Sequence, residues 1–179
     1  YTINSAKIIA KVSSIAAAVL FVLGAGYCAY SYTVPYSYVD IDINPSIELT
    51  ANIYDRIIKT EALNDEGRNL LNSENLHNTK LEAGLTLLLN RARDNGYLKP
   101  ETLSGNTILM TVTSRDDKKS EKLKNEVKKT TIAELERNKI DSEVFIAEAS
   151  IRQKDEAKKL GVTPGKLVLI EEAAEDEPG

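Results

Sequence analysis

The sequence is poor in the side chains that most often form disulfides and metal sites. Among its 179 residues there is one cysteine, Cys28, one histidine, His77, and no tryptophan. A single cysteine excludes a disulfide within the chain, and Cys28 lies inside an apolar run. Zinc needs clustered histidine, cysteine or carboxylate ligands at fixed spacings, and these residues do not provide them. We therefore expect no metal and no cofactor.

The sequence also lacks the motifs of common enzyme classes. It contains no glycine-rich phosphate-binding loop, no nucleophile elbow and no serine supported by a histidine. Asp40, Asp42 and Glu48 suggest an acidic pair for acid-base chemistry, but they alternate with apolar residues and so are expected on the solvated face of a strand. A membrane-tethered hydrolase is disfavoured because no nucleophile and base can be named, and we expect no turnover enzyme.

Positive charge is in slight deficit. The chain has 23 Lys and Arg against 27 Asp and Glu, a formal net charge of −4. Lys7 and Lys11 are the only charged residues before Asp40, so the rest of the chain is more acidic than the whole. An acidic surface does not favour nucleic acid, and we expect none as a partner.

One uncharged stretch is long enough to cross a membrane. From Val12 to Ala29 the sequence is mostly apolar, and the next charge is Asp40. A run of about 18 or more such residues indicates a transmembrane helix, which we predict over residues 12–33. Lys7 and Lys11 precede it, so the amino terminus is expected in the cytoplasm and the carboxyl part outside the cell membrane. The alternative is a cleaved signal peptide with these lysines as its charged region.

A strand pattern interrupted by a proline follows the apolar run, over residues 38–50. Its apolar side chains share one parity: Val39, Ile41, Ile43, Ile47 and Leu49. A period of two is typical of a strand with one face in the core. Pro45 has no backbone N–H to donate, so the hydrogen-bond ladder must break at this point. The sequence predicts two strands that meet at the Asn44-Pro45 peptide.

The remaining residues predict a compact domain of strands and helices. Strands are expected over residues 56–63, 107–114 (central) and 143–149, and helices between Thr79 and Gly96 and over 120–138, 152–160 and 164–172. Residues up to Asn78 are expected to form a loop or a short helical piece. The order βββ-α-β-α-β-αα predicts an α/β (α+β) fold, a small mixed sheet covered on one face by helices and preceded by one transmembrane helix.

These elements predict the organisation of the chain. We expect a cytoplasmic juxtamembrane stub at 1–11, the transmembrane helix at 12–33, an extracytoplasmic domain at 36–174 and a tail or linker at 175–179. The chain begins without methionine, so we expect it to be part of a longer protein with a further cytoplasmic segment.

Asn44 and Pro45 are the candidate catalytic residues, because their chemistry needs only a dipeptide and a geometry. Asparagine usually reacts with the backbone nitrogen of the next residue, but Pro45 offers no N–H. The side-chain nitrogen of Asn44 can instead attack the Asn44 carbonyl carbon, which forms a succinimide and releases Pro45 as a new amino terminus. A kink held by flanking strands could supply the geometry. The alternative is a simple turn in a passive membrane-anchored binding or spacer domain.

The longer motif around this dipeptide indicates a function more strongly than the dipeptide alone. Residues 39–49 read VDIDINPSIEL, and Asn52 and DRII at 55–58 follow. After a single membrane helix, this pattern resembles the juxtamembrane and periplasmic-type domain of RsgI-type anti-sigma factors, and the resemblance covers essentially the whole chain.

The resemblance implies an anti-sigma factor in the cell membrane that transduces a signal across it. The extracytoplasmic domain is expected to cleave itself at Asn44-Pro45, and the fragments to stay associated until a signal separates them and permits intramembrane proteolysis. Implied partners are an alternative sigma factor, bound through a cytoplasmic segment outside this chain, an intramembrane protease, and a polysaccharide bound through a carboxyl-terminal module outside this chain.

Overall fold

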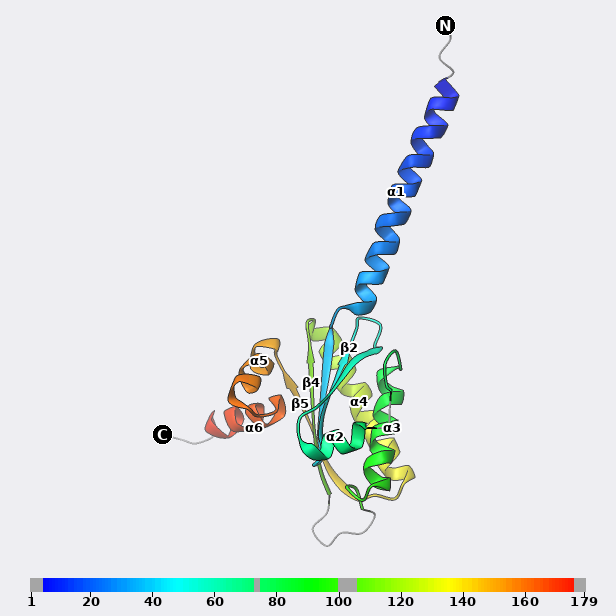
Figure 1. Cartoon of the computed structure of the whole chain (residues 1–179). Helices are drawn as coiled ribbons and strands as arrows, with labels where there is room; N and C mark the ends of the chain where they lie inside the picture. Colours follow the sequence, from blue (N-terminus) through cyan, green and yellow to red (C-terminus); the bar gives the residue numbers. More distant parts are fainter. Residues whose placement is uncertain (1–4, 73–74, 100–105, 176–179) are drawn as a thin grey trace. The chain divides into compact units, whose positions relative to one another are not determined.

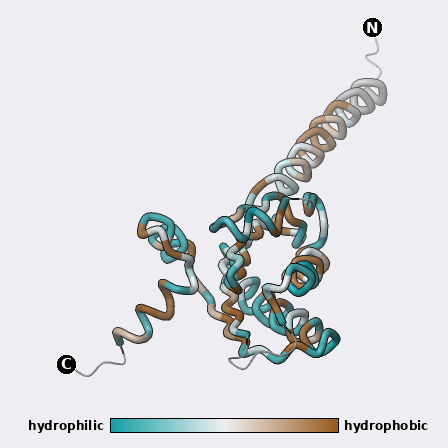
Figure 2. Tube along the Cα trace, turned by 60° about the horizontal axis from the view of Figure 1, so that its bottom comes forward, coloured by the Kyte–Doolittle hydropathy of each residue, from teal (hydrophilic) through white to brown (hydrophobic). Residues whose placement is uncertain are grey.

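The chain forms two compact units. The computed structural model describes residues 5–72, 75–99 and 106–175, so residues 1–4 of the predicted stub and 176–179 of the predicted tail lie outside the described residues. The units are Tyr1–Val34 and Pro35–Gly179. The first consists of helix α1 (Ser5–Thr33), in which Ile15–Thr33 is long and apolar enough to cross a membrane. Figure 2 shows this segment mostly in brown and white, as the sequence predicts.

A mixed sheet is the basis of the second unit. Its five described strands lie in the order β3-β2-β1-β4-β5 (Figure 1). They are β1 (Ser37–Asp42), β2 (Ser46–Ala51), β3 (Ile57–Ala62), β4 (Asn106–Ser114) and β5 (Ser142–Ala149). All neighbours are antiparallel except β4 and β5, which are parallel. Strand β1 is thus the middle strand, paired with β2 on one side and β4 on the other.

The helices follow the predicted order, with one addition. In the described part of this unit they are α2 (Asp65–Leu71), α3 (Leu81–Asp94), α4 (Asp117–Arg137), α5 (Ile151–Leu160) and α6 (Pro164–Glu175). The α/β class is confirmed, and the polar stretch before Asn78 contains the short helix α2. This helix forms because the side chain of Asn64 caps its first turn by accepting from the N–H of Gly67.

Helices cover both faces of the sheet, whereas the sequence predicted cover on one face. On the face of α3 and α4, the Thr131 hydroxyl of α4 donates to the Met110 sulfur of β4 at 3.2 Å. On the other face lie α5 and α6 (Figure 1). Gly165 of α6 approaches β4 so closely that a Cβ there would be 2.1 Å from the hydroxyl oxygen of Thr111. Adjacent residues of a strand point to opposite faces, which places these two layers on opposite sides.

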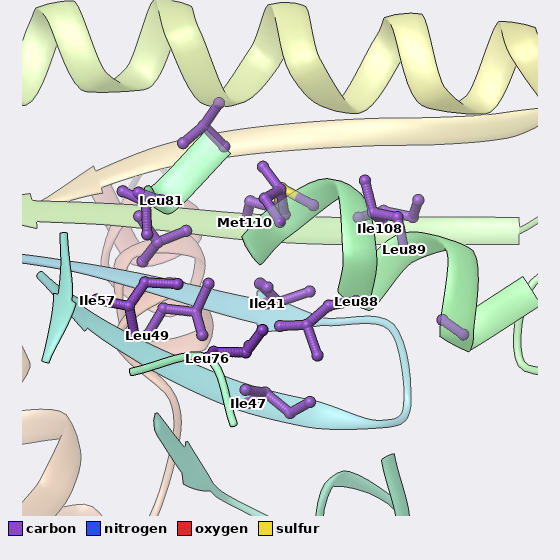
Figure 3. Packing of buried hydrophobic residues seen from close by; sticks show 14 of the residues in the cluster. Ile41, Ile47, Leu49, Ile57, Leu76, Leu81, Leu88, Leu89, Ile108 and Met110 are labelled. Atoms are coloured by element: carbon purple, nitrogen blue, oxygen red, sulfur yellow. The ribbon is translucent and has the colours of Figure 1, made fainter. Parts of the chain in front are cut away.

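The hydrophobic core lies between the sheet and α3 and α4. The odd-numbered side chains of β1 and β2 enter it as predicted: Val39, Ile41, Ile47 and Leu49 are at most 4% exposed. Ile43 is partly buried against the same core. Figure 3 shows Ile41 and Ile47 extending from neighbouring strands, with Leu88 of α3 beside them. The predicted parity of this hairpin is confirmed.

Candidate functional site

Asn44 and Pro45 lie in the turn that joins β1 to β2. The strand pairing ends with Asp42 opposite Ser46, and the residues between them form the connection. The backbone N–H of Ile43 closes it by donating to the Pro45 carbonyl at 3.0 Å. The predicted break in the ladder is therefore confirmed, and it is a tight hairpin turn at one end of the middle strand.

The backbone of Asn44 takes the left-handed conformation, with φ at 64°. Most residues with a Cβ avoid this region, and asparagine tolerates it better than most because its short polar side chain bonds locally. Asn44 is exposed, whereas Pro45 is buried. The turn thus presents an asparagine side chain at the surface while the next residue is fixed in the protein.

Asn64 contacts both sides of the Asn44-Pro45 bond. Its side-chain nitrogen donates to Asn44 Oδ1 at 3.2 Å. Its side-chain oxygen accepts from the backbone N–H of Ser46 at 3.0 Å and of Gly67 at 2.8 Å. The sequence analysis did not select Asn64. The available signal was its position as an N-cap, directly before the acidic first turn of α2.

Ser46 is fixed through its side chain and its carbonyl as well. Its hydroxyl donates to Asp42 Oδ1 at 2.6 Å, which joins the two ends of the turn. Its carbonyl accepts from the N–H of Leu63 at 2.9 Å. An acyl shift to a serine requires that the serine directly follow the carbonyl that is attacked. Ser46 follows Pro45 rather than Asn44, so its hydroxyl is not in that position.

Asp40, Asp42 and Glu48 are buried, and the prediction that they lie on a solvated face was wrong. Their exposed fractions are 0%, 8% and 8%. They do point away from the hydrophobic core, as the alternation predicts. That face is nevertheless covered by α5 and α6, because strand alternation shows on which side a residue lies but not whether a second layer packs there.

Lys154 of α5 faces these carboxylates. Its ammonium group pairs with the carboxylate of Glu48 on β2, and it lies 4.4 Å from the centre of the Tyr38 ring on β1. One lysine therefore contacts both strands of the hairpin. Within the described residues, neither carboxyl oxygen of Asp40 has a hydrogen-bond partner.

The carboxyl group of Asp40 is held in its protonated form. Burial, together with the charges of Glu48 and Asp42, raises its pKa from 3.8 to about 8, against the opposing effect of Lys154. An isolated charge is costly in a protein interior, and protonation avoids that cost. At neutral pH the middle strand thus carries a largely neutral acid.

We expect Asp40 to make the domain less stable as the pH rises. A carboxyl whose pKa is raised by folding, here from 3.8 to about 8, adds stability below the unfolded value and loses it as the pH passes up through the folded value. The loss amounts to about 6 kcal/mol at most. Asp40→Asn keeps the shape without a proton to lose, so it should be more stable than the parent at about pH 9 and similar to it near about pH 4.

Urea denaturation followed by circular dichroism at several pH values measures this difference. Asp155→Asn is the control, because Asp155 is exposed on α5 and should leave the pH dependence unchanged. If Asp40→Asn lost stability with pH as steeply as the parent, Asp40 would not be the group responsible.

The described residues form a cavity but no cluster of metal ligands. Within the described residues, no group of three or more His, Cys, Asp or Glu side chains could hold a metal ion. A cavity of about 370 Å³ lies beside the buried acids, and its lining includes Asp40, Glu48, Lys154 and Thr163.

Comparison with known proteins shows the family of the chain. Residues 36–172 match the family described as "Anti-sigma factor RsgI-like central domain". The chain belongs to this family. The RsgI resemblance inferred from the sequence motif is thereby confirmed, and the match includes the whole sheet and the turn that holds Asn44 and Pro45.

Several anti-sigma-I factors are similar to this RsgI-like chain. It is 40% identical over 168 residues to the anti-sigma-I factor RsgI7 of Acetivibrio thermocellus, covering 94% of the chain and 31% of the relative. It is 28% identical over 148 residues to RsgI4 of the same organism, covering 80% and 28%. It is 27% identical over 144 residues to the anti-sigma-I factor RsgI of Bacillus subtilis, covering 80% and 36%. The chain thus spans about a third of the length of these relatives.

Proposed function

We propose that this RsgI-like domain cleaves itself once, at Asn44-Pro45, and that the cut lets an anti-sigma factor transmit a signal across the membrane. The observation that carries the proposal is the turn itself. Its exposed asparagine has a left-handed backbone, its side-chain oxygen is held by Asn64, and the next residue is a buried proline. Membership of the RsgI-like family adds independent support.

The reaction needs no water and no external reagent. The side-chain nitrogen of Asn44 forms a bond to the Asn44 carbonyl carbon, and the bond from that carbon to the Pro45 nitrogen breaks. One proton leaves the attacking nitrogen and one is gained by the departing nitrogen, so the proton count balances. The products are an amino-terminal fragment that ends in a succinimide at residue 44 and a carboxyl-terminal fragment that begins at Pro45.

The two fragments stay together because the cut lies at the end of the middle strand. Strand β1 belongs to the amino-terminal fragment, and both of its neighbours, β2 and β4, belong to the carboxyl-terminal fragment. Val39 and Ile41 of β1 are buried in the hydrophobic core, which stabilises the complex by about 3–6 kcal/mol through area transfer. The hydrogen bond from Ser46 to Asp42 also crosses the cut.

Helix α1 and the names of the relatives support a wider arrangement. The chain is a single-pass membrane protein with residues 1–11 in the cytoplasm, residues 12–33 in the membrane, and residues 36–174 outside as the self-cleaving domain, with 175–179 as a linker. The relatives are named anti-sigma-I factors, which supports an alternative sigma factor as the partner of a cytoplasmic segment. Separation of the fragments would expose the membrane stub to an intramembrane protease, and a carboxyl-terminal module would bind polysaccharide.

A passive spacer is the second candidate, and the same turn favours it in one respect. A left-handed asparagine between two strands is a common solution for a hairpin connection, with or without chemistry. In that case the chain would remain covalently intact and α1 would only tether the domain.

Mass spectrometry of the purified chain under denaturing conditions separates the two candidates. Self-cleavage predicts a fragment that begins with Pro45-Ser46-Ile47, and an amino-terminal fragment that is lighter by one water than hydrolysis would give. After the succinimide opens, that water is regained. A chain that stays whole after prolonged incubation in native buffer would support the spacer instead.

A further inference from the structure

We propose that Asn64 is a positioning residue for the cleavage, because it fixes which atom of the Asn44 side-chain amide is free to attack. The inference rests on the proposed self-cleavage and concerns how the turn directs it. An amide can rotate to exchange its oxygen and nitrogen, and only the nitrogen can form the succinimide. A device that selects one orientation would therefore raise the fraction of chains that are ready to react.

The selection begins at the backbone. The N–H groups of Ser46 and Gly67 both donate to the side-chain oxygen of Asn64, at 3.0 Å and 2.8 Å. Backbone N–H groups can only donate, so they determine which end of the Asn64 amide faces them. The nitrogen of Asn64 must then face the turn, where it can bond only to an acceptor. That acceptor is Asn44 Oδ1, at 3.2 Å.

This contact leaves the nitrogen of Asn44 as the available atom. The described residues provide no hydrogen-bond partner for it, whereas its oxygen is engaged by Asn64. The same bond assists the chemistry: an amide nitrogen attacks well only as it loses a proton, and the charge that develops spreads to Oδ1. A donor already placed at that oxygen stabilises this charge without reorganisation.

The support for Asn64 is rigid. Gly67 packs against the start of β2 so closely that a Cβ there would lie 2.3 Å from the Ser46 carbonyl oxygen. That carbonyl is held in turn by the N–H of Leu63. Helix α2 and strand β2 are therefore locked together, and Asn64 is presented to Asn44 from a fixed base.

Asn64→Asp tests the proposal, because it separates the two tasks of the side chain. A carboxylate still accepts from both backbone N–H groups and is as good an N-cap as asparagine, so the fold should persist. It has no donor for Asn44, and it instead attracts the nitrogen of Asn44, which turns the amide the wrong way. We expect cleavage to slow by more than about tenfold.

The pH dependence of the cleavage rate of Asn64→Asp is a second measurement, and a merely structural role of Asn64 would not change it. When the new carboxyl is protonated, it can again donate to Asn44 Oδ1, so the deficit relative to the parent should shrink at low pH. Because two backbone N–H groups donate to this carboxylate, we expect its protonation below the usual value of about pH 4. Asn125→Asp makes the same chemical change on the exposed surface of α4, and it should cleave like the parent at every pH.

The rates are measured on the full chain, synthesised in a cell-free system with lipid nanodiscs and sampled over time on denaturing gels. Unchanged cleavage in Asn64→Asp would overturn the positioning role. So would a slowing matched by an equal loss of stability in urea and by no recovery at low pH. If the parent chain itself stays whole, the proposed self-cleavage fails, which is a different result from either of these.

Discussion

Asn44→Ala should leave the chain whole while the fold persists. Alanine has no side-chain nitrogen to attack the carbonyl carbon, so the proposed route is closed. Asn44→Gln should also block or strongly slow cleavage, because its longer side chain must close a less favourable six-membered ring. On a denaturing gel, each variant should migrate as one full-length band, whereas the parent should give two fragments.

Asn44→Gly is the matched control for the backbone. The φ of 64° at this position costs alanine more than asparagine, so a defect in Asn44→Ala could reflect a distorted turn. Glycine adopts this conformation freely and also lacks the nucleophile. It should therefore be uncut with a well-formed hairpin. Cleavage at an undiminished rate in either Asn44→Ala or Asn44→Gly would exclude side-chain cyclisation as the route.

The parts of the site that could be predicted are those with local signals. The alternation of apolar residues gave the faces of β1 and β2, and Pro45 gave the position of the break between them, because both effects act within a few residues. Local signals also indicated the helices after Asn78, whereas they left the stretch that forms α2 open between a loop and a short helical piece. The turn could therefore be predicted as an irregularity that contains the candidate dipeptide.

The contacts that complete the site could not be predicted, because they join distant parts of the chain. Asn64 lies 20 residues after Asn44, and its N-cap pattern says nothing of what its second amide atom contacts. Lys154 lies 106 residues after Glu48, and nothing in a single sequence shows that α5 folds back onto this face. The carboxylates were assigned to solvent for the same reason: polar residues under a second layer have the same alternation as polar residues in water.

Ile41→Asp should release the amino-terminal fragment of the cleaved protein without any signal. Ile41 is 4% exposed on the core face of β1, and after the cut that strand is held only by its ladders and its packing. An unpaired charge placed there costs several kcal/mol, which is comparable to the whole burial gain of the strand. The fragments should part in native buffer, whereas those of the parent should co-purify and part only in denaturant.

Two controls test whether the fragments part because the middle strand loses its packing or only because a charge is added. Ile53→Asp makes the same substitution at an isoleucine that is 41% exposed, and its fragments should stay together. Ile41→Val keeps the site apolar and should weaken retention by only about 1 kcal/mol. If the fragments of Ile41→Asp still co-purified in native buffer, packing of the middle strand would not be what holds them.

Testing Ile41→Asp in cells links retention of the amino-terminal fragment to signalling. We expect its effect to depend on whether the Asn44-Pro45 bond is cut. In the full-length protein, Ile41→Asp should raise sigma-dependent reporter output in the absence of inducer. The double variant Asn44→Ala with Ile41→Asp should not, because the weakened strand then remains covalently joined to β2 and the membrane stub cannot separate. High output from the double variant would mean that an unfolded domain is sufficient for signalling, and that the break at Asn44-Pro45 does not gate it.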